Sequence, residues 1–221
     1  MRQPTNPGAA WAELDEAWQL AFEAAWEAVR TGNIGVGAVA TDAEGRIVAV
    51  GRNRVSESDA PPRQVAGTTL AHAEINVLTQ FPFRSPKTMV LTTTLEPCLQ
   101  CSAAIRMGPI ARVRFAGRDP LWEGAHDFGS LGPWLGRREP VPREGPRPDL
   151  IGHFGVLLAR FGPGLVPHVE DALRQSGEGP LLDLAIGLEA SQAWPGLLEL
   201  DVATVLAQLW TDLADAVDAV G

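Results

Sequence analysis

The chain has 221 residues, which suffice for one domain with a complete hydrophobic core and an extension that is short for a second domain. Hydrophobic residues make up 45% and charged residues 20%, as in ordinary globular proteins, and this composition argues against wholesale disorder. The sequence contains neither an apolar stretch of the roughly 18 residues that a membrane span needs nor the apolar run of a secretory signal, so we expect a cytoplasmic protein.

The net charge of −9 is concentrated near the C-terminus, where residues 151–221 carry 2 basic and 10 acidic side chains. Residues 1–150 are almost neutral, with 16 basic and 17 acidic side chains. Because nucleic-acid binding requires a basic face that displaces counterions, this distribution argues against a polynucleotide partner.

Apolar residues recur every three or four positions from Trp11 to Arg30, which predicts an amphipathic helix. We interpret its tryptophan stripe as core packing rather than as a surface that stacks on bases. Strands are then expected at 36–41 and 47–51 as an antiparallel pair, followed by a loop at 56–69, a helix at 72–80, a strand at 88–93, a helix at 98–107 and a strand at 111–116. A strand, a helix and a strand with short connections impose parallel pairing, so the core is predicted to be α/β.

Residues 137–148 hold four prolines and predict a semi-rigid, extended linker. We therefore divide the chain into a main domain at 1–136, a proline-rich linker at 137–150 and an acidic helical extension at 151–221. Helices are expected in the extension at 151–161, 169–175, 181–190 and 200–220. They carry no motif of chemistry, so we expect them to pack on the main domain or on a second subunit.

Two short motifs carry the chemistry, His72-Ala73-Glu74 and Pro97-Cys98-Leu99-Gln100-Cys101. His72, Cys98 and Cys101 offer one nitrogen and two sulfur ligands, which leaves the fourth tetrahedral position of Zn²⁺ open for water, as in a catalytic site. The two cysteines lie three residues apart at the start of a predicted helix, where the helix dipole favours the thiolate. Glu74 is expected to reach the water without binding the metal, and to act as general acid and base.

Two other readings of the cysteines are a redox Cys-x-x-Cys pair and half of a four-cysteine zinc knot. A knot needs two more cysteines or histidines at short spacing, which the sequence lacks. A redox pair does not explain His72 and Glu74 at the start of another predicted helix.

With these motifs, the segment from about Gly35 to Ser130 resembles the zinc-dependent cytidine and deoxycytidylate deaminase superfamily, nearest to its tRNA adenosine deaminase and guanine deaminase branch. The matching strings are Val36-Gly37-Ala38-Val39, Asn53, His72-Ala73-Glu74-Ile75, Thr94 to Ile105 and Gly117-Arg118-Asp119. The resemblance implies a cytidine-deaminase-like mixed five-stranded sheet sandwiched by helices, a zinc deaminase catalytic domain at 1–136, and a homodimer.

By the same resemblance, Asn53 corresponds to an asparagine whose amide contacts substrate, although a turn asparagine after a strand would look the same. Trp122, His126 and Phe128 follow the last expected strand and could cap a bound ring by stacking, or could be packing residues. Glu96 is interpreted as structural, and Thr92 to Thr94 as strand residues.

The function expected from these residues is zinc-dependent hydrolytic deamination of an amino-substituted nucleobase, nucleoside or related heterocycle, which gives the oxo product and ammonia. One alternative is a tRNA or RNA adenosine deaminase. However, tRNA editors usually carry a basic C-terminal helix, and this chain has an acidic extension instead. An alternative from another class is a catalytically silent zinc-binding protein for assembly or regulation, which would not need Glu74.

Overall fold

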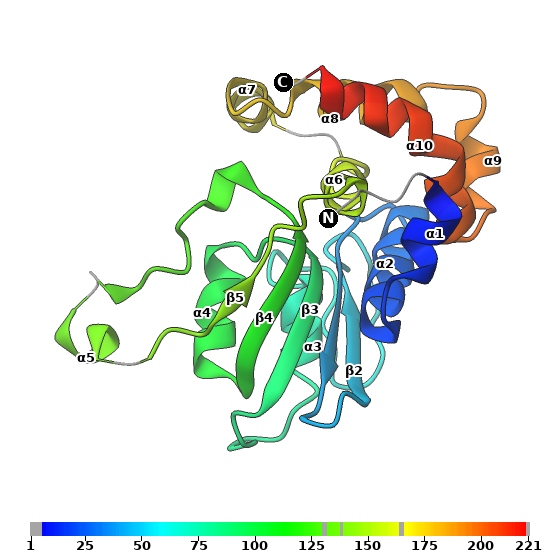
Figure 1. Ribbon diagram of the computed structural model, residues 1–221. Coiled ribbons are helices and arrows are strands. Elements are labelled where there is room, and N and C mark those ends of the chain that lie inside the picture. Colours follow the sequence, from blue (N-terminus) through cyan, green and yellow to red (C-terminus); the bar gives the residue numbers. More distant parts are fainter. Residues whose placement is uncertain (1–5, 130–131, 138, 164–165, 220–221) are drawn as a thin grey trace.

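A five-stranded mixed sheet forms the centre of the molecule in the computed structural model, which describes residues 6–129, 132–137, 139–163 and 166–219 (Figure 1). The strand order is β2-β1-β3-β4-β5, with the bounds β1 Gly37–Thr41, β2 Ile47–Arg52, β3 Met89–Leu95, β4 Ile110–Gly117 and β5 Arg143–Glu144. Strand β1 pairs antiparallel with β2 and β3, whereas β3, β4 and β5 are parallel. The predicted α/β class and mixed five-stranded sheet are confirmed.

The β3-α4-β4 segment brings two strand ends to the same edge of the sheet. Helix α4 (Leu99–Met107) connects β3 to β4, and the register pairs Thr93 with Phe115 and Leu95 with Gly117. This confirms the predicted parallel pairing. The residues that follow β3 and β4 therefore leave the sheet side by side, next to the N-terminal end of α4.

Helices cover both faces of the sheet (Figure 1). Helices α2 (Glu16–Arg30) and α6 (Leu150–Leu158) lie on one face, and α3 (Ala73–Leu78) and α4 lie on the other. The helix predicted at 11–30 is in fact two helices, α1 (Pro7–Ala12) and α2, because the Asp15 carboxylate accepts the backbone N–H of Trp18 at 3.0 Å and caps α2. Trp18 and Trp26 are buried, which confirms the packing interpretation of the tryptophan stripe.

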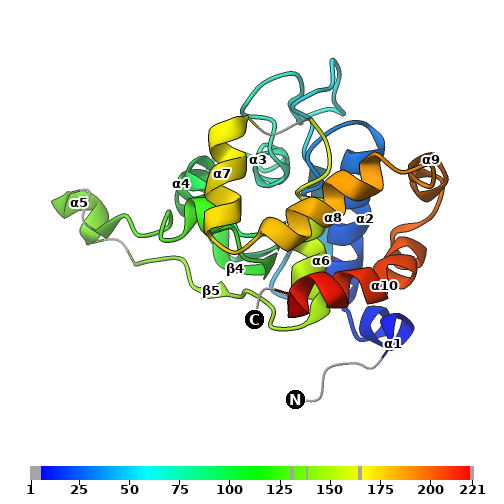
Figure 2. The ribbon, with the colours of Figure 1, turned by 90° about the horizontal axis from the view of Figure 1, so that it is seen from above.

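The C-terminal helices add a further layer outside α6 (Figures 1 and 2). They are α7 (Pro167–Gln175), α8 (Gly179–Glu189), α9 (Trp194–Leu198) and α10 (Val202–Asp218). Both α8 and α10 contact α6, and α10 also contacts α1 and α2. Helices α7, α8 and α10 were predicted, as was α6, whereas α9 was not. The segment between β4 and β5 contains the 3-10 helix η1 (Pro120–Trp122), which contacts α7, and α5 (Pro133–Gly136), which lies apart from the body of the molecule (Figure 2).

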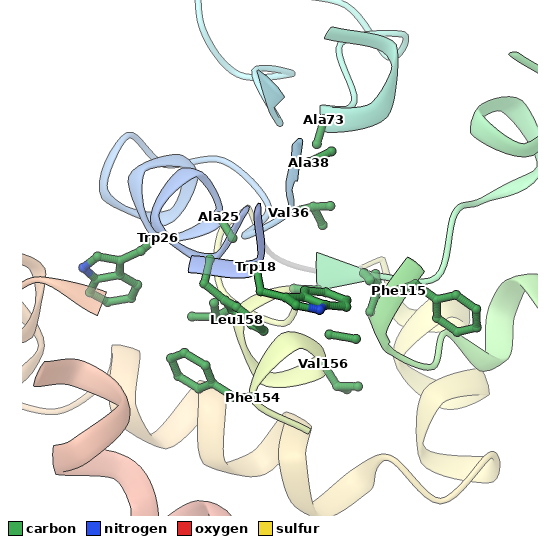
Figure 3. Close-up of a cluster of buried hydrophobic side chains, with 14 of the residues drawn as sticks. Trp18, Ala25, Trp26, Val36, Ala38, Ala73, Phe115, Phe154, Val156 and Leu158 are labelled. Atoms are coloured by element: carbon green, nitrogen blue, oxygen red, sulfur yellow. The ribbon is translucent and has the colours of Figure 1, made fainter. Parts of the chain in front are cut away.

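Helices α2 and α6 share one hydrophobic core under the sheet (Figure 3). The rings of Phe22 and Phe154 stack with their centroids 5.7 Å apart, and both side chains are fully buried. A Cβ at Gly155 would lie 2.2 Å from the carbonyl oxygen of Thr94, so a glycine is needed for α6 to approach the sheet this closely. Burial of each phenylalanine contributes about 1.5–3 kcal/mol.

The expected linker contains strand β5, which pairs with Val113 and Arg114 of β4. Residue 138 of the linker lies outside the described residues. The division into a domain at 1–136, a linker at 137–150 and an extension at 151–221 stays a prediction. Among the described residues, no helix combines the length and the apolar character needed to cross a membrane.

Candidate functional site

Two helix starts meet at the end of the sheet and bring the predicted metal ligands together. His72 is the residue directly before α3, and Cys98 is the residue directly before α4; both have extended backbone conformations. Cys101 lies in the first turn of α4 and is fully buried. Both helix N-termini thus direct their unpaired N–H groups and positive dipole ends toward the same place, which favours negative charge there.

The three candidate ligand atoms have the spacing of a tetrahedral site. His72 Nδ1 lies 3.5 Å from Cys98 Sγ and 3.6 Å from Cys101 Sγ, and all three atoms lie within 4.8 Å of one another. Tetrahedral bonds of about 2.0–2.1 Å to nitrogen and about 2.3 Å to sulfur place these atoms about 3.6 Å apart, so the residues fit Zn²⁺. In the part of the chain that the structure describes, no fourth His, Cys, Asp or Glu completes the group. A fourth position therefore remains for water or substrate.

Of the two thiols, Cys98 is the one whose surroundings favour the thiolate, whereas the hydrogen bond of Cys101 with Cys98, together with burial, raises the pKa of Cys101. Hydrogen bonding with Cys101 lowers the pKa of Cys98 to about 4; His72 acts in the same direction, and burial opposes the shift. The thiolate is the form of cysteine that binds a metal. Burial alone would lower the pKa of His72, but the hydrogen bond with Cys98 acts against burial, and the net result is a pKa above its ordinary value.

Glu74 is buried beside this group, with 3% of its surface exposed. Its Oε1 accepts the hydroxyl of Thr93 at 3.1 Å, and its Oε2 accepts the thiol of Cys101 at 3.3 Å. Burial, followed by the charge of Cys98, raises the pKa of the Glu74 carboxyl. A carboxyl with a raised pKa keeps its proton to a higher pH than an exposed glutamate does, which suits a general acid and base.

Thr93 also belongs to this site, although the sequence alone indicated only an ordinary strand residue. It lies in β3, where it pairs with Ala38 of β1 and Phe115 of β4. Its side chain fixes the orientation of the Glu74 carboxyl from the sheet side. The available signal was a run of three threonines in a strand predicted to be buried, where each hydroxyl needs a partner.

Asn53 lies directly after β2 and is 2% exposed. Its backbone N–H donates to the Val36 carbonyl at 2.9 Å, and its side-chain oxygen accepts the N–H of Val55 at 3.1 Å. Among the described residues, its amide nitrogen makes no hydrogen bond with the protein. That nitrogen remains available as a donor to a ligand.

The three aromatic candidates lie in or after η1. Trp122 ends η1 and is 39% exposed, whereas Phe128 is 7% exposed and packs with the Arg106 guanidinium 5.8 Å from its ring centre. Arg106 lies in the last turn of α4, at the opposite end from the cysteines. His126 and Phe128 line one cavity of about 330 Å³, and His126 also lines a second cavity of about 270 Å³ beside Glu96. No contact described in the structure joins these aromatic residues to the metal group.

Glu96 lies between β3 and α4 and fixes the loop after β4. Its Oε2 accepts the backbone N–H of Asp119 at 3.3 Å. The Asp119 carboxylate in turn accepts the N–H of Leu121 and caps η1. This places Glu96 in the structural role expected from the sequence, and the carboxyl also lines the cavity of about 270 Å³.

Comparisons with known proteins were made against a family model and against solved structures. Residues 12–116 match the model of the cytidine and deoxycytidylate deaminase zinc-binding region. A structure from a study of A-to-I editing by tRNA:A34 deaminases at the wobble position of transfer RNA is 29% identical, covering 58% of this chain and 96% of that chain with a TM-score of 0.48. Guanine deaminase from Nitrosomonas europaea is 18% identical, covering 72% and 94% of the two chains with a TM-score of 0.46. The dCMP deaminase from the cyanophage S-TIM5 is 19% identical, covering 60% and 99% with a TM-score of 0.38.

A comparison with curated proteins gives no match. The family model contains both motifs, from His72 to Cys101, and the donor set that the structure brings together is that of a zinc site. Residues 12–116 are therefore identified as the zinc-binding region of the cytidine and deoxycytidylate deaminase family.

Proposed function

We propose that this protein is a hydrolase that removes the amino group of a small amino-substituted heterocycle, either a nucleobase or a nucleoside. Family membership supports a deaminase acting on a C–N bond. The observation that carries the proposal is the buried Glu74 carboxyl, which contacts both Thr93 and the candidate ligand Cys101. A purely structural zinc site would have no use for a buried acid at this position.

In the proposed reaction, His72, Cys98 and Cys101 hold the metal. Bound zinc supplies a water whose pKa is lowered to about 7, which makes it a nucleophile at neutral pH. Glu74 accepts a proton from that water and delivers it to a ring nitrogen of the substrate. It then transfers the second proton to the departing amino group, so one water and one substrate give the oxo product and ammonia.

We propose that Asn53 helps to hold the ring, because its amide nitrogen has no partner among the described residues and lies at the end of β2. Trp122 and His126 remain proposed substrate contacts, since Trp122 is exposed and His126 lines two cavities. Phe128 is also a proposed substrate contact, and its contact with Arg106 supports a packing role in addition.

The proposed substrate is a small molecule and not a polynucleotide, since residues 151–221 are strongly acidic and residues 1–150 are nearly neutral. We also propose a homodimer, and residues 1–136 as the catalytic domain. The size of the substrate, the homodimer and the domain boundary do not change the chemistry of the metal centre, so the reaction can be tested first.

The experiment is ammonia release by the zinc-loaded protein from a panel of bases, nucleosides, nucleotides and tRNA, with the zinc content measured on the same samples. We expect one zinc per chain and ammonia from at least one small heterocycle. Ammonia from tRNA alone would show an RNA deaminase instead. One zinc per chain with no ammonia from any substrate would favour the catalytically silent alternative.

A further inference from the structure

Arg143 of strand β5 lies against the helix that carries the two cysteines. Its Nη2 donates to the hydroxyl oxygen of Ser102 at 2.7 Å, and that hydroxyl donates to the carbonyl of Pro97 at 3.0 Å. Ser102 directly follows Cys101 and is buried. One side of the guanidinium is thus anchored to the first turn of α4.

The other side of the guanidinium has no hydrogen-bond partner among the described residues. Arg143 Nη1 is fully buried, and among the described residues nothing accepts a hydrogen bond from it. Arg143 also takes part in none of the ion pairs between described residues. An arginine stays protonated in a protein, and a buried donor on a charged group without a partner is costly. The position therefore calls for an acceptor that the described part of the chain does not provide.

A cavity of about 270 Å³ adjoins this guanidinium, and its polar lining consists of Glu96, Arg118, Glu123, His126 and Arg143. Arg118 and Glu123 pair with each other at 2.6 Å. Glu96 accepts the N–H of Asp119, and burial raises the pKa of its carboxyl. Burial, followed by the charge of Arg143, lowers the pKa of His126 and favours its neutral form. Glu96 and Arg143 interact through their charges, but no hydrogen bond or ion pair between described residues joins them, so Arg143 Nη1 is left without an acceptor.

The guanidinium also lies next to the metal centre. Its hydrogen-bond partner Ser102 directly follows the candidate ligand Cys101 in the first turn of α4. An acceptor bound to Arg143 could belong to the same molecule whose ring reaches Glu74.

We propose that Arg143 is a specificity-determining residue that binds an oxyanion on the substrate, so that the preferred substrate is an amino-substituted heterocycle carrying a carboxylate or a phosphate. A guanidinium suits this role because its fixed fork of N–H groups matches the oxygens of either group. This inference rests on the proposed deaminase function. It predicts the charge of the substrate, which the two motifs that contain His72 and Cys98 do not determine.

The test compares each nucleoside with its 5′-monophosphate, and cytosine with 5-carboxycytosine, as substrates of the zinc-loaded protein. We expect the wild type to prefer the anionic member of one pair, and that pair identifies phosphate or carboxylate as the group bound. Arg143→Gln should lower kcat/KM for that member by about 10- to 100-fold, mostly through KM, because a charge-assisted contact is lost. The neutral member should change by less than about threefold on the same argument.

Arg112→Gln is the matched control, since Arg112 lies on the neighbouring strand β4 with its side chain 50% exposed and paired with Glu144. It should leave both members unchanged. Arg143→Lys keeps the charge without the fork and should retain part of the preference, which separates charge recognition from a folding defect. A wild type that prefers the neutral members, or an equal loss for both members in Arg143→Gln, would overturn the proposal.

A second measurement does not depend on turnover. Inorganic phosphate and acetate should raise the thermal midpoint of the wild type and of Arg112→Gln at millimolar concentrations, with a smaller rise in Arg143→Gln. Stabilisation that is lost with Arg143 but without ammonia release would support the oxyanion site and contradict the deaminase function. Turnover with no Arg143-dependent stabilisation and no anionic preference would leave the deaminase function standing and contradict the oxyanion site.

Discussion

At the scale of single residues, the Glu74 carboxyl is held on two sides. One oxygen lies 3.3 Å from Cys101 Sγ, and the Thr93 hydroxyl donates to the other oxygen, which limits the rotation of the carboxyl. Its burial removes the water that would otherwise solvate the ionised form, and this is why its pKa is raised. A group with a fixed orientation and a raised pKa is prepared for repeated proton transfer.

We expect Glu74→Gln to keep the zinc and to lose activity by about 10²–10⁴-fold, because the amide has nearly the same shape but neither accepts nor returns a proton. Zinc content and ammonia release, measured on the same preparation, check this. Glu44→Gln, at a side chain that is 67% exposed, is the matched control and should behave as wild type. Retained zinc with activity within about threefold of the wild type would contradict the proton-transfer role.

The ligand residues could be predicted from the sequence because each pair lies within one helical turn, His72 with Glu74 and Cys98 with Cys101. The roles of Thr93 and Arg143 could not be predicted from the sequence. Their contacts depend on how β3 and the two-residue strand β5 line up beside α3 and α4, which no local pattern encodes. Sequence spacing thus reveals groups that meet within an element, and misses those that meet across the sheet.

At the scale of elements, the segment that carries Asn53 is tied down by an ionic cluster. Glu57 pairs with Arg52 and with Arg54, and it also accepts the side-chain amide of Asn33 at 2.8 Å. Asn33 lies just after α2, so the cluster joins the loop after β2 to the end of that helix. Burial alone would raise the pKa of Glu57, but the hydrogen bond and charge of Arg52, with those of Arg54, lower it below 4.5.

A lowered pKa means that this carboxylate stabilises the fold above its unfolded pKa, and that the stabilisation is lost as the pH falls through the lower, folded value. We expect Glu57→Gln to reduce the free energy of unfolding at pH 7 by about 1.5–3 kcal/mol, the usual worth of hydrogen bonds to a charged group. The difference from wild type should shrink as the pH falls below about 4.5. Urea unfolding of both proteins at several pH values measures it.

Glu144→Gln serves as the control for that series, because the Glu144 side chain is 53% exposed in its pair with Arg112. Its effect should stay within about 0.5 kcal/mol at every pH, as expected for an exposed pair. A Glu57 effect that stays constant down to pH 3 would mean that packing, and not the carboxylate charge, stabilises this loop.

The metal joins α3 to α4, so its loss is expected to loosen both helices. Cys101→Ala should lose zinc and lower the thermal midpoint together, since a metal that binds the folded state stabilises it. A chelator should lower the midpoint of the wild type toward that of Cys101→Ala while leaving the variant itself unchanged. Met107→Ala, at the 64% exposed end of the same helix, should keep the chelator response. A chelator response that persists in Cys101→Ala would exclude Cys101 as a ligand.

Periodicity and turn chemistry predicted the positions of β1 to β4 along the chain, the antiparallel pairing of β1 with β2, the parallel pairing of β3 with β4 and the main C-terminal helices. The break between α1 and α2 was missed because the apolar period continues through it, and the cap at Asp15 decides where α2 begins. Helix α9 was missed because five residues are too few to establish a period.

At the scale of the whole molecule, the family match ends at residue 116, yet α6 packs directly on the sheet. Buried side chains of α6, α8 and α10 belong to the same hydrophobic cluster as those of α2 and the strands. The Trp26 indole N–H also donates to the carbonyl of Leu200 at 2.9 Å, across the length of the chain. The extension thus shares its core with the zinc-binding region, and we expect the two to unfold together.

Phe154→Ala tests this expectation, because Phe154 (labelled in Figure 3) belongs to α6 and its ring stacks on that of Phe22 in α2. Removal of a fully buried phenylalanine ring costs about 3–5 kcal/mol, and this loss should affect the whole chain if the core is shared. Tryptophan fluorescence and zinc release, followed in the same urea titration, should then show one transition that moves to lower urea by both measures. Phe83→Ala makes the same chemical change at a side chain that is 90% exposed, and should leave both curves in place. If residues 151–221 instead form an independent module, Phe154→Ala will shift the fluorescence curve alone, and zinc will be released at the same urea concentration as in the wild type.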